Sequence, residues 1–136
     1  YSAGVTGKPL RVAAVDERAE LFGDVSHGEG FFTGYNTDVL SGYPKAYAIE
    51  LALRTLSPEV TVFDEIGGRG EADAVISGLN SGVSFTASAH AGSIKELLSR
   101  PQARALLECG AFSKIVLLGH EKPCGITGIY NVDEVT

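Results

Sequence analysis

The run VTVFDE at residues 60–65 decides the fold that the sequence predicts. Its first four residues are apolar or β-branched and favour a short buried strand, which then ends in two carboxylates. The flanking segments have the spacing of amphipathic helices, in residues 44–56 before the strand and 72–79 after it. The first of these helices should bury a stripe formed by Ala46, Ile49, Leu53 and Leu56. A buried strand between two such helices is typical of a parallel sheet.

The same alternation extends along most of the chain. A capping box at Ser93 and Glu96 predicts a helix start, and Pro101 predicts a second helix directly after it. The remaining strands are predicted at residues 11–15, 83–89 and 115–118, with an edge strand at 126–132, and residues 23–42 form a glycine-rich loop. We therefore expect one domain over residues 1–136, of the α/β class, with a mostly parallel sheet and helices on both faces.

Composition limits the functions that the chain can have. It has 136 residues, 44% of them hydrophobic, and a net charge of −6 without a basic stripe, which argues against binding to nucleic acid. Neither a signal peptide nor an apolar run of about 20 residues is visible, so a cytoplasmic chain is expected. Cys109 and Cys124 are expected to be reduced thiols. The sequence contains no methionine, which favours a fragment or a processed chain.

Polar side chains follow three of the predicted strands at the point where each strand ends. These endings are Asp16-Glu17-Arg18, Asp64-Glu65 and Ser88-Ala89-His90. The carboxyl ends of parallel strands meet at one edge of a sheet, where α/β proteins bind their ligands. We therefore predict that Asp16, Glu17, Asp64, Glu65 and His90 lie together at that edge.

The strand that ends in Asp64 and Glu65 has the form of a Walker B strand. In such a strand the first carboxylate holds Mg²⁺, usually through water, and the second polarises the water that attacks the γ-phosphate. An acid pair at a strand end can equally cap the helix that follows. The pattern alone leaves both alternatives open.

Four longer segments resemble the stage III sporulation protein AA family. They are VDERAE at 15–20, TDVLSGYPKA at 37–46, DEIG at 64–67 and the Ala-His pair at 89–90, in the family's order and spacing. Arg100-Pro101 and residues 128–130 fit its C-terminal part, so the resemblance covers nearly the whole chain. Asn36, the Gly67-Gly68-Arg69 run and Ala91 depart from its usual pattern.

This family is similar to the RecA-like secretion ATPases, and the resemblance implies a P-loop NTPase core that uses ATP and Mg²⁺. Glu17 would lie in the aspartate box, Glu65 in Walker B and His90 in the histidine box, as the catalytic groups. Asp64 would hold the metal, and cofactor binding would involve Asp64, Asp16, Arg18 and Arg69. The residues themselves also allow a solvated ion-pair cluster at residues 16–18, and surface roles for both arginines.

The phosphate-binding loop of such an ATPase is missing. The string SAGVTGKP at residues 2–9 lacks the first glycine, and its final proline offers neither a hydroxyl for Mg²⁺ nor a backbone N–H. The resemblance implies that the strand feeding this loop lies between those at 83–89 and 115–118. With that strand absent, we expect these two strands to pair directly, and the chain alone to bind Mg-ATP poorly.

Two functions follow as expectations. The first is a sporulation-associated, secretion-type ATPase that drives assembly or export by an envelope-spanning complex. Such an ATPase would form a homo-oligomeric ring, and its partners in the membrane complex would hold it peripherally at the membrane. The second is a non-enzymatic assembly platform of that complex with an incomplete nucleotide site. A nucleic-acid-dependent motor would need the basic surface that the chain lacks.

Overall fold

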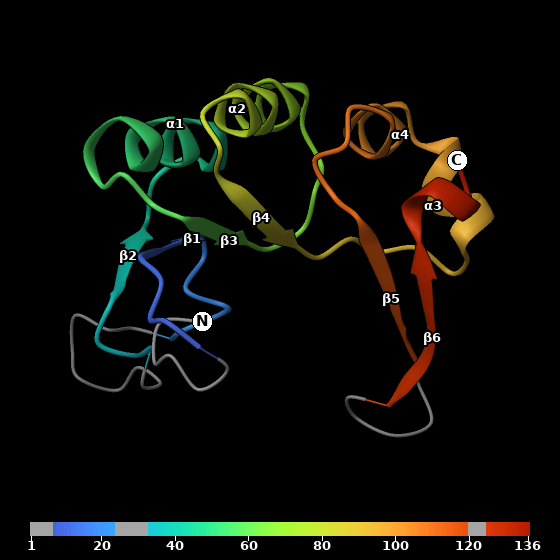
Figure 1. Cartoon of the computed structure of the whole chain (residues 1–136), viewed down its shortest axis with the longest axis horizontal. Coiled ribbons are helices and arrows are strands. Elements are labelled where there is room, and N and C mark those ends of the chain that lie inside the picture. The colour runs from blue at the N-terminus through green and yellow to red at the C-terminus, as the bar shows by residue number, and fades with distance from the viewer. Residues whose placement is uncertain (1–6, 24–32, 120–124) are drawn as a thin grey trace.

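A four-stranded parallel sheet forms the centre of the fold (Figure 1). The computed structural model describes residues 7–23, 33–119 and 125–136. The strands lie in the order β2-β1-β3-β4, and each neighbouring pair is parallel. Their bounds are β1 Val12–Asp16, β2 Thr37–Ser41, β3 Val60–Phe63 and β4 Ser84–Ala87. The prediction of an α/β fold with a mostly parallel sheet is confirmed.

Helices α1 (Lys45–Thr55) and α2 (Arg69–Asn80) cover one face of this sheet (Figure 1). Their connections, from β2 to β3 and from β3 to β4, advance across the sheet in the same direction. Because such crossovers are right-handed, both helices are placed on the same face. Among the described residues no helix covers the opposite face, so the prediction of helices on both faces is wrong for this part of the chain.

Strand β2 lies inside the segment that the sequence predicted to be a loop. It is an edge strand that pairs with β1 from Thr37 to Ser41. Two of its residues, Asp38 and Ser41, are exposed, and the strand contains no continuous apolar run. Residues 24–32 of the predicted loop, Cys124 and most of the 2–9 string lie outside the described residues.

The core lies between the sheet and the two helices. Its largest fully buried apolar side chains in this layer are Val15, Ile49, Phe63 and Val75, and the rings of Phe63 and Phe85 meet edge to face with centroids 6.4 Å apart. Helix α2 approaches this layer closely at Gly78. A Cβ atom there would lie 2.5 Å from Phe85 Cζ, so only glycine lets the helix pack at this depth.

The C-terminal part forms a separate two-stranded sheet. Helices α3 (Ile94–Ser99) and α4 (Pro101–Glu108) precede strands β5 (Lys114–Leu118) and β6 (Ile126–Asn131), and a short 3₁₀ helix spans Val132–Glu134. Strands β5 and β6 are antiparallel and pair with each other. The predicted edge strand at 126–132 is thereby found as β6.

The predicted pairing of β4 with β5 is wrong. Strand β4 pairs with β3, and β5 takes its hydrogen-bonding partner from β6, the next strand along the chain. A local antiparallel partner satisfies the backbone of β5 without closing the space beside β4. One consequence is an exposed apolar face, on which Val116 lies opposite Ile129 and Leu118 opposite Ile126. Their exposed fractions are 49% for Val116 and 61% for the other three.

Candidate functional site

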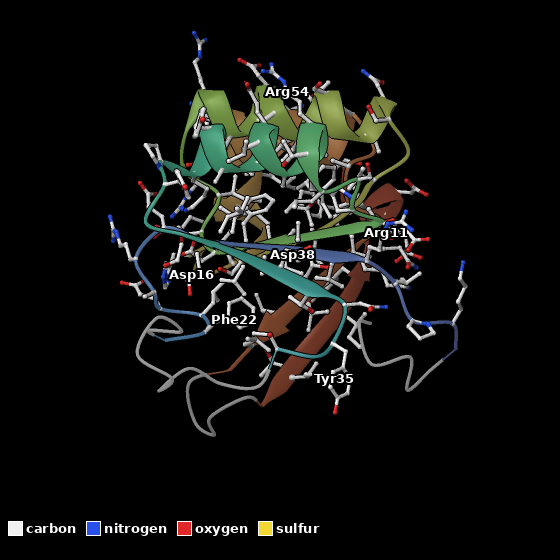
Figure 2. All side chains as sticks on the ribbon, turned by 90° about the vertical axis from the view of Figure 1, so that its left-hand side faces the viewer. Arg11, Asp16, Phe22, Tyr35, Asp38 and Arg54 are labelled. Atoms are coloured by element: carbon white, nitrogen blue, oxygen red, sulfur yellow. The ribbon has the colours of Figure 1, made fainter. Side chains whose placement is uncertain are left out.

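The strand register brings the predicted site residues to one edge of the sheet. Val15 is aligned with Phe63, and Phe63 with Ala87, so Asp16, Asp64 and Ser88 each follow at the same level. Figure 2 shows Asp16 at one end of β1 and Arg11 at the other. Glu17, Glu65 and His90 are exposed and continue from these three strand ends. The register confirms the carboxyl edge for Asp16 and Asp64, whereas the grouping of Glu17, Glu65 and His90 with them stays a prediction.

Asp16 organises the chain that leaves β1. It is fully buried, and its carboxylate accepts hydrogen bonds from the backbone N–H groups of Glu20 at 2.8 Å, Leu21 at 3.0 Å and Phe22 at 2.9 Å. The turn also contains Ala19 at φ 56°. In Figure 2, Phe22 lies on the side of the sheet away from α1 and α2. The hydrogen bonds to Asp16 therefore hold the turn of residues 17–22 against the end of β1. The role of Asp16 in cofactor binding stays a prediction.

Asp64 is paired with a lysine that the sequence analysis missed. Lys45 Nζ lies 3.0 Å from Asp64 Oδ1, and the two side chains are 9% and 14% exposed. The oxygen has no aligned hydrogen-bond donor, so the contact is an ion pair. Lys45 is the first residue of α1 and shares its buried face with Ala48, Ile49 and Ala52. Lys45 has the helical spacing of the apolar residues Ala48, Ile49 and Ala52, and this pattern in the sequence could have indicated that the lysine is buried.

The peptide of Glu65 is held in an unusual conformation. Its φ is +27°, in the left-handed region that a non-glycine residue rarely occupies. The N–H of Glu65 donates to Ser88 Oγ at 2.9 Å, and its carbonyl accepts from Lys45 Nζ at 2.9 Å. The side chain is exposed. Strain of this kind is concentrated at functional sites.

The acid pair does not cap the helix that follows. The N-terminus of α2 is capped by Glu71, whose carboxylate accepts from the N–H groups of Gly67 at 2.9 Å and Gly68 at 3.1 Å. This removes the structural alternative that the sequence left open for Asp64 and Glu65. Arg69, the first residue of α2, is exposed beside this turn.

His90 lies at an open hollow of about 260 Å³, which it lines with Ala91, Gly92, Glu96 and Arg100. The predicted capping box of α3 is confirmed in its first half, because Ser93 Oγ accepts from the N–H of Glu96 at 3.2 Å; the Glu96 carboxylate bonds one residue earlier than a capping box requires. The Glu96 carboxylate accepts from the N–H of Gly92 at 2.7 Å and from Arg100 at 3.0 Å. These two contacts, the first being the larger, hold the pKa of Glu96 below its ordinary value of 4.5.

Replacing Glu96 with glutamine should remove a stabilising contribution that depends on pH. Because folding lowers the pKa of Glu96, its contribution is complete above the unfolded pKa of 4.5 and is lost as pH falls through the folded pKa. We expect Glu96→Gln to unfold at a lower urea concentration than the unmodified chain at neutral pH, and the difference to shrink as the pH falls below 4.5 and through the folded pKa. Glu50→Gln, which breaks the exposed pair with Arg54, is the control. A difference that stays constant as the pH is lowered until the folded chain has protonated Glu96 would contradict the prediction.

A role for the carboxylates of the site in binding Mg²⁺ stays a prediction. Among the residues that the structure describes, no group of three or more His, Cys, Asp or Glu side chains could hold a metal ion. One oxygen of Asp64 already faces Lys45. For Asp64 the Walker B pattern predicts an indirect contact to the ion, through bound water.

Comparison with known proteins settles the family. A family model described as "Sporulation stage III, protein AA" matches residues 3–135. The chain belongs to this family. Stage III sporulation protein AA of Bacillus subtilis (strain 168) is 38% identical to it over 133 residues, which cover 94% of the chain and 43% of that relative. The chain thus spans less than half the length of this relative. No solved structure matches the chain.

In this member of the stage III sporulation protein AA family, the described part of the chain has no helix long and apolar enough to cross a membrane. Arg18 is exposed on the turn that Asp16 organises, next to Glu17. The assignments to an ATP site all stay predictions, those of Asp64 and Glu65 as much as those of Asp16, Glu17, Arg18, Arg69 and His90. The geometry adds two residues to the site, Lys45 and Ser88, both in direct contact with the Asp64-Glu65 segment.

Proposed function

We propose that this chain is the part of a sporulation ATPase core that carries its hydrolytic groups. Family membership supports a role in sporulation. In the full-length protein, Glu65 acts as the base that polarises the attacking water and Asp64 orients Mg²⁺. Glu17 and His90 contact the phosphates or the water, and Asp16, Arg18 and Arg69 belong to the nucleotide-binding surroundings. The proposed output is assembly or export by an envelope-spanning complex.

One observation carries this proposal: the contrast between two adjacent carboxylates at the carboxyl edge of the sheet. Asp64 is mostly buried and paired with Lys45, whereas Glu65 presents its carboxylate to solvent from a strained turn. A buried, fixed acid followed by an exposed acid fits the roles that Walker B chemistry gives to these two positions. Mg-ATP would supply the phosphoryl group and its counter-charge when bound.

A homo-oligomeric ring with membrane-complex partners, in the cytoplasm, is the assembly that we propose for the full-length protein. The alternative function is a non-enzymatic assembly platform. It is favoured by the exposed aliphatic face of the β5–β6 hairpin, formed by Val116, Leu118, Ile126 and Ile129. Exposed contiguous apolar patches commonly mark protein interfaces. The two functions differ in whether ATP is turned over.

Turnover by the full-length protein decides between them. We expect Glu65→Gln to keep ATP binding and to lower kcat about 100-fold, the usual size of the loss of a general base. Glu59→Gln, at the opposite end of β3, is the matched control and should leave turnover unchanged. Unchanged turnover in Glu65→Gln would remove Glu65 from its proposed role.

Calorimetry of residues 1–136 alone should show poor binding of Mg-ATP, and micromolar binding would contradict the need for a phosphate loop.

A further inference from the structure

The backbone of Glu65 forms hydrogen bonds with two side chains of other elements, one at its N–H group and one at its carbonyl group. Ser88, directly after β4, accepts the N–H of Glu65 at 2.9 Å, and Lys45, at the start of α1, donates to its carbonyl at 2.9 Å. Ser88 also accepts the N–H of Ile66 through its backbone carbonyl at 2.9 Å. Three elements, α1, β3 and β4, therefore converge on one residue.

Lys45 and Ser88, the two side chains that bind the Glu65 backbone, are themselves held in place. Lys45 is buried against the sheet and held by the ion pair with Asp64. It belongs to the helix face that packs into the core through Ala48 and Ile49. Ser88 follows β4 directly, and β4 is paired with β3 along its length. The contacts to Glu65 are thus anchored in the rigid part of the fold.

The conformation that they hold is one that Glu65 would not adopt alone. A non-glycine residue at φ +27° relaxes to negative φ unless its surroundings over-determine it. Rotation about φ changes the direction in which the side chain leaves the backbone. Without these contacts, the Glu65 carboxylate would point elsewhere relative to Asp64 and His90.

We infer that Lys45 and Ser88 are positioning residues that aim the Glu65 carboxylate at the reacting water. The inference rests on the proposed function, in which Glu65 is the base. Neither side chain needs to touch the nucleotide for this role. Their effect passes through the Glu65 peptide, so it should vanish when Glu65 can no longer act as a base.

The first test uses Ser88→Ala in the full-length protein, because Ser88 is exposed and its loss leaves the core intact. We expect kcat to fall about tenfold, since small misplacements of reacting groups cost one to two orders of magnitude, with KM unchanged. Ser88→Thr keeps the hydroxyl and should restore kcat. Ser84→Ala, also exposed and at the other end of β4, is the matched control and should have no effect.

The second test repeats the substitutions in the Glu65→Gln background. If Ser88→Ala and Lys45→Met act through Glu65, neither lowers kcat further there. Lys45→Met also lowers stability, so its turnover is measured well below its Tm. A further loss in the Glu65→Gln background, equal to that in the unmodified protein, would identify a purely structural effect and overturn the inference.

Failure of the inference is distinguishable from failure of the proposed function. If Glu65→Gln abolishes turnover while Ser88→Ala and Lys45→Met keep full kcat, the ATPase stands and the positioning role falls. If the unmodified full-length protein does not hydrolyse ATP, the proposed function falls. Crystal structures of that protein and its Ser88→Ala variant then decide the positioning: a changed φ at Glu65 with a displaced carboxylate supports it, and an unchanged residue overturns it.

Discussion

Replacing Lys45 with methionine is expected to lower the free energy of unfolding by about 3 kcal/mol. The substitution leaves the Asp64 carboxylate, 14% exposed, without the ammonium group 3.0 Å away. It also removes the donor to the Glu65 carbonyl. Removing one partner of a buried ion pair costs far more than the pair contributes, because the remaining charge cannot be resolvated. Urea unfolding of the chain at neutral pH measures the loss.

The double variant Lys45→Met/Asp64→Leu separates the two causes. With both charges gone, no carboxylate is left unpaired, and most of the lost stability should return. Lys95→Met, an exposed lysine of α3, is the control for removing a positive charge and should change stability by less than about 0.5 kcal/mol. A loss in the Lys45 variant no larger than that in the control would show that Asp64 is solvated in the folded chain.

The helices and central strands could be predicted because their signals are local. Periodicity predicted a helix at 44–56 and a strand at 60–63, where the structure has Lys45–Thr55 and Val60–Phe63. The buried stripe of α1 differs in detail. Ala48, Ile49 and Ala52 face the core, whereas Ala46 is only partly buried. Small residues let the helix approach the sheet closely, a preference that hydrophobic spacing alone does not reveal.

The errors concern pairings between distant parts of the chain. Strand β2 is short, partly polar and preceded by glycines, so its sequence looks like a loop until β1 offers it a partner. An uninterrupted apolar run such as that of β5 is typical of a strand covered on both faces, yet Val116 and Leu118 are exposed. Which strand pairs with which depends on tertiary contacts that a local pattern does not contain.

The edge of the sheet at which the candidate site lies could be predicted from the sequence, whereas the contacts that each side chain makes there could not. Parallel strands must bring Asp16, Asp64 and Ser88 to one edge. Whether a carboxylate there faces a lysine, a set of backbone N–H groups or solvent depends on how the chain folds around it. The carboxylate of Asp64 meets Lys45 of another element, and that of Asp16 meets the N–H groups of the turn that follows it. The sequence therefore predicted the edge at which these strand ends meet, but gave no role to Lys45 or Ser88, which hold the Asp64-Glu65 segment.

Replacing Asp16 with alanine is expected to cost about 3 kcal/mol of folding free energy, since three backbone N–H groups lose an ionised acceptor. Asp16→Asn keeps one acceptor oxygen and should lose about half as much. The turn after β1 should also loosen, so trypsin should cleave after Arg18, which is exposed, faster than in the unmodified chain. Urea unfolding and the cleavage rate at Arg18 are the two measurements.

The outcome also separates the two roles considered for Asp16. Asp38→Ala removes an exposed acid of β2 and should change neither stability nor cleavage, which controls for the loss of a negative charge. If Asp16 serves mainly to bind Mg-ATP, Asp16→Ala would remain as stable as this control and would weaken nucleotide binding by the full-length protein. Because its buried carboxylate already accepts three N–H groups, Asp16 would contribute to the nucleotide-binding surroundings by holding this turn and not by contacting the ligand. We therefore expect the stability loss, and with it a displacement of Glu17 and Arg18, which follow Asp16 on the same turn.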